Sequence, residues 1–198
     1  MKMKKSIVLV ILLLTNFLLV KAQVTPTTPI IPLGGSINNP AYTNPISTMG
    51  SYFKDTENKF NQWVGTWQYE NGTTLVKIVI TKLEAVYVPA NTIPGRTPCY
   101  VDLLVGGYYY RENSVVKTNH LTYADNFRPP LKCQPYENPN PNSLSIYYDE
   151  IDKSPDLMSS RAYLTFLTGS TTQAKWEFAS ESKRNYSIPD NVILTKVP

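Results

Sequence analysis

Residues 60–82 read FNQWVGTWQYENGTTLVKIVITK, and this stretch predicts a β-hairpin. Residues 63–70 and 73–82 are two runs rich in β-branched and aromatic side chains, which favour strands. The pair Asn71-Gly72 between them favours a tight type I′ turn, because both residue types tolerate the positive φ angles that this turn requires. A short helical turn is expected just before, over residues 56–62, with Phe60 and Trp63 facing the core.

Six further strands are predicted after the hairpin, and an alternation of period two supports several of them. Ala174, Trp176 and Phe178 share one face of their run, and charged residues lie on the other face. Eight largely sequential strands predict an all-β domain, an eight-stranded antiparallel meander closed as an up-and-down barrel, with a β-sandwich as the alternative. The six additional runs are residues 100–110, 114–118, 144–151, 162–167, 173–178 and 192–196.

Two connections, residues 84–98 and 119–142, are long and rich in Pro and Asn. Loops of this length are uncommon without a role, and we expect them to lie over a binding surface. The Gly106-Gly107 pair falls inside a predicted strand, where glycine usually marks a bulge or a close approach of another backbone.

The first 22 residues predict a cleavable export signal. Lys2, Lys4 and Lys5 precede a short apolar run over residues 7–20, and Ala22 offers a small residue at a cut site. A membrane-spanning helix needs about 20 apolar residues, so we expect cleavage rather than retention as an anchor. The product is expected to be secreted or periplasmic. It is not expected to be a lipoprotein, because no cysteine lies near the cut, and no later segment predicts a membrane span.

Removing this signal changes the charge of the chain. The full sequence holds 19 Lys and Arg against 15 Asp and Glu, and four of the lysines lie within residues 1–22. The mature chain is therefore formally neutral, which argues against a nucleic-acid partner. Residues 23–50, rich in Pro, Thr and Asn, are expected to form a disordered tether before the domain of residues 51–198. The alternative is an ordered arm that packs on the domain through Ile30, Ile31 and Leu33.

The chain contains two cysteines, Cys99 and Cys133. In an oxidising compartment an even pair predicts a disulfide, with two free buried thiols as the alternative.

The search for catalytic chemistry yields few candidates. His120 stands alone, so no catalytic residue, metal site or cofactor is predicted. Glu150 and Asp152 share a predicted strand face, but a solvated face explains them well. Asp102 lies on the face that also carries Leu104 and Tyr108, so a buried carboxylate there needs a partner. Arg161 or a tyrosine hydroxyl could supply that partner. Asp102, Tyr108 and Arg161 are thus the candidate ligand-binding residues, with a structural ion pair as the alternative.

The residues Phe60-Asn61-Gln62-Trp63-Val64-Gly65-Thr66-Trp67 resemble the start of a lipocalin or wider calycin barrel. In that family a short helix leads into Gly-x-Trp on the first strand, and the tryptophan closes the floor of the barrel. The resemblance implies structural roles for Gly65 and Trp67. The sequence departs from the lipocalin pattern by lacking its Thr-Asp-Tyr element and by offering Lys196 where an arginine is expected.

A second resemblance covers more of the chain. The Lys-rich signal, residues 64–69, the strand at residues 106–110 and the ending at residues 188–196 are together similar to small uncharacterised exported proteins of Bacteroidetes (Flavobacterium-like) bacteria. That likeness implies a compartment and a fold, and it implies no activity.

The sequence as a whole predicts an exported, non-enzymatic β-barrel module. Its 14 tyrosines suit a mouth that binds a small apolar or glycan-like ligand, framed by the two long loops, although tyrosine also covers sheet surfaces. The first alternative is a surface protein with a structural or protein-interaction role. The second is a hydrolase that uses Asp102 or the pair Glu150 and Asp152.

Overall fold

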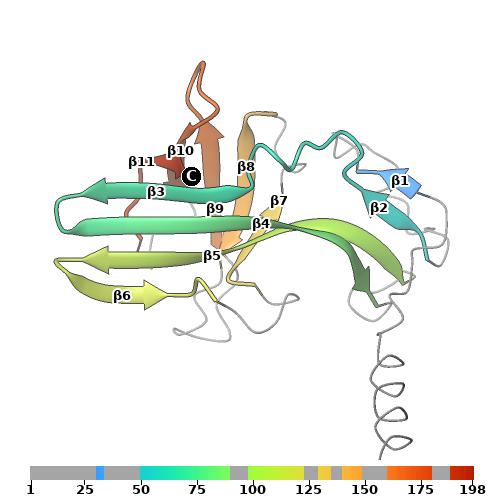
Figure 1. Cartoon of the computed structure of the whole chain (residues 1–198), viewed down its shortest axis with the longest axis horizontal. Helices are drawn as coiled ribbons and strands as arrows, with labels where there is room; N and C mark the ends of the chain where they lie inside the picture. Colours follow the sequence, from blue (N-terminus) through green and yellow to red (C-terminus); the bar gives the residue numbers. More distant parts are fainter. Residues whose placement is uncertain are drawn as a thin grey trace, which may run out of the picture.

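The computed structural model describes residues 30–33, 50–89, 98–122, 129–134, 140–148, 160–179 and 188–198. The described residues form eleven strands and no helix (Figure 1). None of them therefore provides a helix that is long and apolar enough to cross a membrane.

Eight of the strands close into an antiparallel barrel. Each pairs with the next barrel strand along the chain, and the last strand pairs with the first, so the topology is up-and-down. The predicted barrel is thereby confirmed over the sandwich. In chain order the ring consists of β3 (Gly65–Asn71), β4 (Thr74–Val88), β5 (Cys99–Glu112), β7 (Leu131–Gln134), β8 (Ser143–Tyr148), β9 (Ser160–Phe166), β10 (Gln173–Phe178) and β11 (Val192–Val197).

Three strands lie outside the ring. They are β1 (Ile30–Pro32), β2 (Tyr52–Lys54) and β6 (Val115–Asn119). The run at residues 114–118 is thus a strand, as predicted, but β6 forms a hairpin with β5 beyond the barrel wall. In its place the ring contains β7, a strand that was not predicted, because the sequence assigns residues 119–142 to a loop.

The strands β4 and β5 extend past the barrel toward β1 and β2 (Figure 1). The predicted loop 84–98 was therefore placed too early, because residues 84–88 continue β4. Between Leu83 and Val86 the pairing of β4 with β5 shifts register, and Ala85 has a φ of 51° there. This irregularity is a β-bulge, which lets a long strand bend while it stays paired.

Two tight turns differ from their predicted positions by one residue. Asn71 pairs with Thr74, so the first loop is Gly72-Thr73, and Gly72 has a φ of 58°. Glycine at the first central position, followed by a residue with negative φ, fits a type II′ turn rather than type I′. The β5–β6 loop is Asn113-Ser114, where both φ angles are positive, as type I′ requires.

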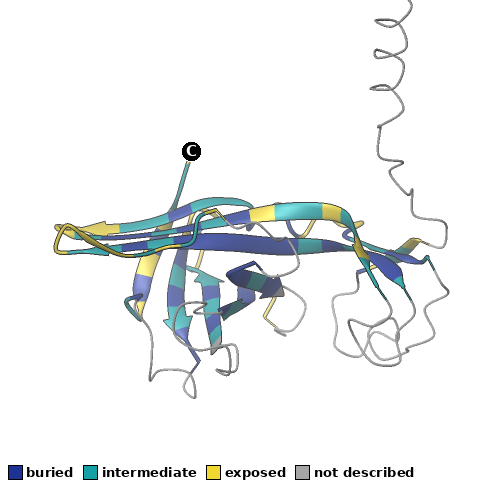
Figure 2. Ribbon diagram, turned by 90° about the horizontal axis from the view of Figure 1, so that it is seen from below, coloured by how far each residue is buried: buried dark blue, intermediate teal, exposed yellow. Residues whose placement is uncertain are grey.

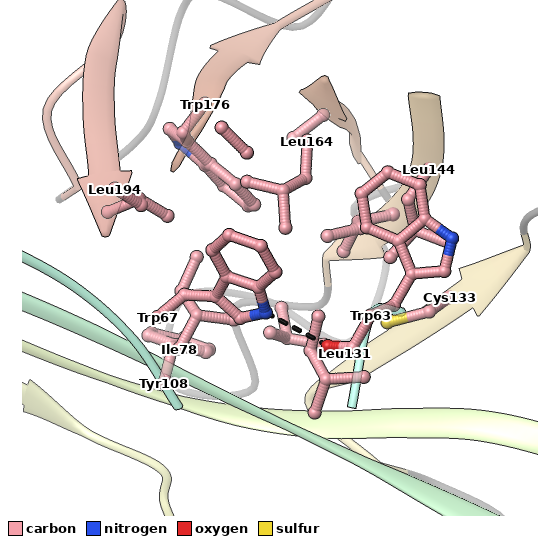
Figure 3. Close-up of a cluster of buried hydrophobic side chains, with 14 of the residues drawn as sticks. Trp63, Trp67, Ile78, Tyr108, Leu131, Cys133, Leu144, Leu164, Trp176 and Leu194 are labelled. Carbon is pink, nitrogen blue, oxygen red and sulfur yellow. Dashed lines mark hydrogen bonds between the residues drawn. The ribbon is translucent and has the colours of Figure 1, made fainter. Parts of the chain in front are cut away.

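The barrel's own side chains occupy its interior. All three tryptophans of the chain are fully buried, and inward-facing residues from every barrel strand join one hydrophobic cluster (Figure 3). Along the long sheet β5 is largely buried, whereas the tips of the β3–β4 and β5–β6 hairpins are exposed (Figure 2). The predicted close approach at the glycine pair is also present, since a Cβ atom on Gly107 would lie 2.2 Å from the carbonyl oxygen of His120.

The segment before β3 contains turns, with no helix assigned among residues 55–64. The amides of Asn61 and Trp63 each bond the carbonyl three residues earlier, at 3.1 and 3.0 Å. Phe60 and Trp63 are buried in the core cluster, as predicted.

Within the predicted tether of residues 23–50, residues 30–33 and Gly50 are described. Residues 30–33 form β1 and the buried residue Leu33, and we call them the N-terminal arm. The packed-arm alternative applies to these four residues; the rest of residues 23–49 lies outside the described residues.

The predicted disulfide is wrong, because Cys99 and Cys133 are both buried and not bonded. Cys133 lies opposite Leu104, whereas Cys99 lies five residues earlier on β5. At about 3.3 Å per strand residue the two backbones are roughly 16 Å apart, far beyond the reach of a disulfide. Burial also raises the pKa of the Cys133 thiol well above its usual range, so this group stays protonated and unreactive.

Candidate functional site

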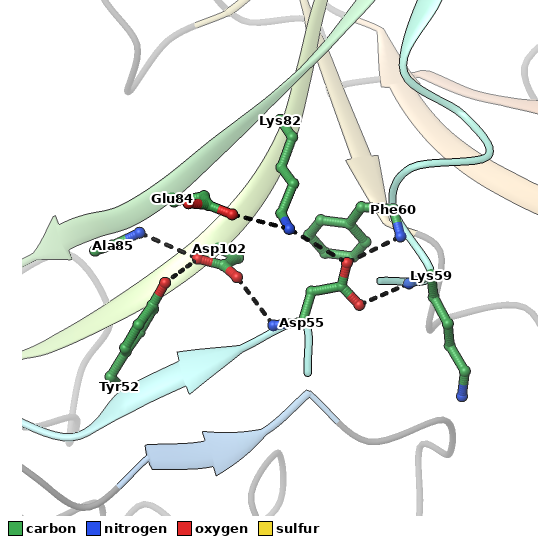
Figure 4. Close-up of polar contacts among 8 residues, drawn as sticks. All are labelled: Tyr52, Asp55, Lys59, Phe60, Lys82, Glu84, Ala85 and Asp102. Carbon is green, nitrogen blue, oxygen red and sulfur yellow. Dashed lines mark hydrogen bonds and ion pairs between the residues drawn. The ribbon is translucent and has the colours of Figure 1, made fainter. Parts of the chain in front are cut away.

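A polar cluster lies where the long strands leave the barrel (Figure 4). We call it the arm junction, and it consists of Tyr52, Asp55, Lys82, Glu84, Ala85 and Asp102. Its two aspartates are almost fully buried, Asp102 at 1% exposed and Asp55 at 2%. A buried carboxylate is costly unless hydrogen bonds and positive charge compensate it.

Asp102 lies opposite the bulge of β4 and accepts three hydrogen bonds. Its Oδ1 accepts the Tyr52 hydroxyl at 2.5 Å and the Ala85 amide at 3.1 Å. Its Oδ2 accepts the Asp55 amide at 2.9 Å. The carboxylate therefore joins β5, the bulge of β4 and the chain just after β2. The bulge matters because it turns the Ala85 N–H away from the strand ladder and toward the carboxylate.

Asp55 holds the turn that leads to the first barrel strand. Its two carboxylate oxygens accept the amides of Lys59 at 2.9 Å and Phe60 at 3.0 Å. Such side-chain acceptance at the start of a turn satisfies amides that have no other partner. This turn places Phe60 and Trp63 in the core.

Lys82 supplies the positive charge. Its ammonium lies 3.6 Å from Asp55 Oδ2 and 3.0 Å from Glu84 Oε1. Burial acts to lower the pKa of Lys82, but its hydrogen bond to Glu84 and the charges of Asp55, Glu84 and Asp102 outweigh burial and raise it. Burial first, and then the hydrogen bond and charge of Asp102, also raise the pKa of the Tyr52 phenol well above its usual value.

This geometry suits a structural role, in which the cluster holds β2 against β4 and β5. The three hydrogen bonds that Asp102 accepts all come from groups of the chain itself, and its side chain is almost fully buried. The cluster can thus fix β2 to the barrel. No group of three or more metal-ligating side chains occurs among the described residues.

The structure separates the three candidate ligand-binding residues. Asp102 finds a tyrosine hydroxyl, one of the two predicted partners, but that tyrosine is Tyr52 of β2. Arg161 instead donates to the Tyr147 hydroxyl at 2.6 Å and lies over the Tyr147 ring. Tyr108 is buried in the barrel, with its ring 4.5 Å from that of Tyr148. The hydrogen bonds that Asp102 accepts involve neither Tyr108 nor Arg161.

The other candidates are placed as follows. His120 lies beside the Tyr108 ring at 5.2 Å, at the end of the β6 hairpin. Glu150 and Asp152 lie outside the described residues.

Gly65 and Trp67 lie at the end of the barrel where β3 begins. The Trp67 indole donates to the Trp63 carbonyl at 2.9 Å, and the Trp63 ring stacks on Phe166 at 4.3 Å. Lys196 crosses this end, with its ammonium 5.5 Å above the Trp67 ring and 3.0 Å from the Gln62 carbonyl. Gly65 has a φ of 129°, and a Cβ atom there would lie 2.9 Å from Lys196 Cε. These contacts pack the two residues against the segment before β3 and against Lys196 of β11. The structural role that the resemblance implies for them stays a prediction.

The partner of Asp102 could not be identified from the sequence, because Tyr52 is 50 residues away and lies in a segment without strong strand signals. The available signal was a carboxylate flanked by apolar residues in a predicted strand, which indicated that some partner was needed.

Comparison with protein families gives one match. A model described as a family of unknown function (DUF6705) matches residues 1–197, which is nearly the whole chain. No curated protein and no solved structure matches the chain.

Proposed function

The chain belongs to this family of unknown function, and we propose that it is an exported, non-enzymatic β-barrel module that acts through its outer surface as a structural or protein-interaction protein. The observation that carries the proposal is the occupied interior. The barrel's largest buried side chains, including Trp67, Trp176 and Tyr108, fill the space that a ligand in the barrel would need (Figure 3).

The proposed export rests on the sequence of residues 1–22. We also propose, from the resemblances in the sequence, that the chain is related to exported Bacteroidetes proteins and that its first barrel strand begins like that of a lipocalin. Two buried cysteines without a disulfide are compatible with an exported chain, since stability here comes from a large apolar core. Expression of the full chain in a bacterium with a secretory pathway, followed by intact-mass measurement, tests this part. We expect the mature chain to begin at Gln23 and to leave the cytoplasm; a chain that keeps Met1 in the cytoplasm contradicts it.

Native mass spectrometry of the mature protein from such cells tests the proposed mode of action. We expect the mass of the polypeptide with no small molecule bound. A stoichiometric adduct that denaturation releases would contradict action through the outer surface alone.

The second candidate is the binding of a small apolar or glycan-like ligand. The observation that favours it is a pair of buried donors, because the indole N–H groups of Trp63 and Trp176 have no acceptor among the described residues. A buried unpaired donor costs about 1–3 kcal/mol, and an acceptor on a ligand or an ordered water would offset that cost. Trp176→Phe separates the two candidates, since it should weaken any such adduct, whereas an empty barrel shows only the polypeptide mass in both the parent chain and the variant.

A further inference from the structure

We propose that the edge of β2, together with the buried position of Leu33, is an acceptor site for residues 30–33 of a second copy of this chain. The inference rests on the proposed function, and it names the partner and the contact surface. The partner's arm would replace the molecule's own arm strand for strand.

The acceptor side of this contact is held without the arm. On one side β2 pairs in parallel with β5, through Tyr52 with Tyr100 and Phe53 with Val101. Asp102 fixes the Tyr52 hydroxyl and the Asp55 amide at the two ends of β2 (Figure 4). Losing the arm would therefore leave β2 in place with a row of unpaired backbone groups, which is a template for another strand.

The donor side is held weakly. Among the described strands β1 pairs only with β2, over three residues, and the Leu33 amide adds one bond to the Lys54 carbonyl at 2.7 Å. Ile30 is 54% exposed, whereas Leu33 is 6% exposed and belongs to the core cluster. A short edge strand with one buried anchor opens locally at low free-energy cost.

The connection between donor and acceptor permits exchange. Parallel neighbours need a long crossover, and residues 34–49 supply it between β1 and β2. Fully extended, that length of chain reaches about 50 Å, enough to place the arm on a neighbour. An exchanged arm makes the same contacts with the partner that it makes within its own molecule, which is why strand exchange is an accessible route to dimers. Because the molecule's own arm is covalently joined to its acceptor, it competes at a high effective concentration, so exchange should grow as the protein is concentrated.

Paired cysteines test the proposal, because Ile31 and Phe53 are direct partners in the β1–β2 register. One full mature chain carries Ile31→Cys, and a second chain with a different tag carries Phe53→Cys. The two are mixed at high concentration and oxidised. We expect a disulfide-linked heterodimer, at a yield about tenfold above a collision control in which Tyr87→Cys, an exposed position, replaces Phe53→Cys.

Leu33 gives the specificity control. Leu33→Ala in the chain with Ile31→Cys should lower the heterodimer about tenfold, because the altered arm competes with the acceptor's own intact arm. Ile30→Ala, at the exposed end of the same strand, should leave the yield unchanged.

The proposal is overturned if the chain carrying both Ile31→Cys and Phe53→Cys closes its internal disulfide while the mixed single variants give no heterodimer above the collision control. That result would leave action through the outer surface standing. A stoichiometric small ligand in native mass spectrometry would instead contradict the proposed function without changing the crosslinking result.

Discussion

The barrel interior and the arm junction are both buried, but they are held by different chemistry. The interior is apolar and aromatic, with inward-facing side chains from eight strands in one cluster. The arm junction is polar and depends on one carboxylate, Asp102, that accepts three hydrogen bonds from three parts of the chain. Apolar packing is spread over many contacts, whereas a polar network fails when a single member is removed. A substitution in the barrel core should therefore destabilise the whole fold, whereas removal of Asp102 should release β2 locally.

The largest effect is expected in the barrel. Trp176→Ala removes a fully buried indole and should lower the free energy of unfolding by about 3–5 kcal/mol, as measured by urea denaturation. Trp67→Phe and Trp176→Phe form a matched pair, because only the Trp67 indole has an acceptor, the Trp63 carbonyl. Trp67→Phe should cost about 1 kcal/mol more than Trp176→Phe. An equal cost for the two would show that the hydrogen bond contributes nothing.

The next effect is expected in the arm junction. Asp102→Ala leaves the Tyr52 hydroxyl and the amides of Asp55 and Ala85 without their acceptor. We expect a loss of about 3 kcal/mol and faster amide exchange in β2, with smaller changes in β8 to β11. Asp102→Asn keeps one acceptor oxygen and should lie between Asp102→Ala and the wild type. Unchanged stability in Asp102→Ala would contradict a fastening role.

Two glycines allow a comparison between a backbone constraint in the barrel wall, at Gly107, and one in a turn, at Gly72. A Cβ atom on Gly107 would meet the His120 carbonyl oxygen at 2.2 Å, so Gly107→Ala forces a shift between β5 and the end of its hairpin. We expect a cost of about 2 kcal/mol in thermal or urea unfolding. Gly72 has open space around it but a φ of 58°, so Gly72→Ala should cost only about 1 kcal/mol. The reverse order would place the tighter constraint in the turn.

The smallest effect concerns alkaline pH. Because burial and Asp102 raise the pKa of Tyr52, the folded chain keeps a phenol proton that the unfolded chain releases above about pH 10. The stabilisation is complete below about pH 10 and is lost as the pH rises toward the folded-state pKa. Burial, and then Glu112, also raise the pKa of Tyr110 to about 12. Tyr52→Phe should therefore reduce the fall in unfolding free energy above pH 10 without removing it; an identical pH dependence in the variant would contradict the coupling.

Local patterns in the sequence predicted most of the barrel. The alternation at β9 and β10 and the paired runs around Gly72 identify their strands directly, because side-chain period and turn chemistry are local properties. The strand β7 was missed because it has four residues and follows Pro129-Pro130, so its conformation depends on pairing with β5 and β8. The run that forms β6 reads like a barrel strand, and only the tertiary pairing reveals that it lies outside the ring.

The candidate site was predicted less well. The sequence identified Asp102 as a buried carboxylate in need of a partner, but its contacts depend on a bulge in β4 and on β2. The cysteines were paired on compartment chemistry alone, although their positions along β5 and β7 keep them apart.

Hydrogen exchange of the wild-type chain tests the central contrast most directly. The account predicts that amides of residues 30–33 exchange by local opening. The Asp55 amide, which donates to Asp102, and the Tyr100 amide, which donates to the Ser51 carbonyl, should remain protected close to the level of β3 and β11. Equal protection of residues 30–33 and the barrel, or loss of protection at Asp55 and Tyr100 together with β1, would contradict an arm that leaves a preformed acceptor edge behind.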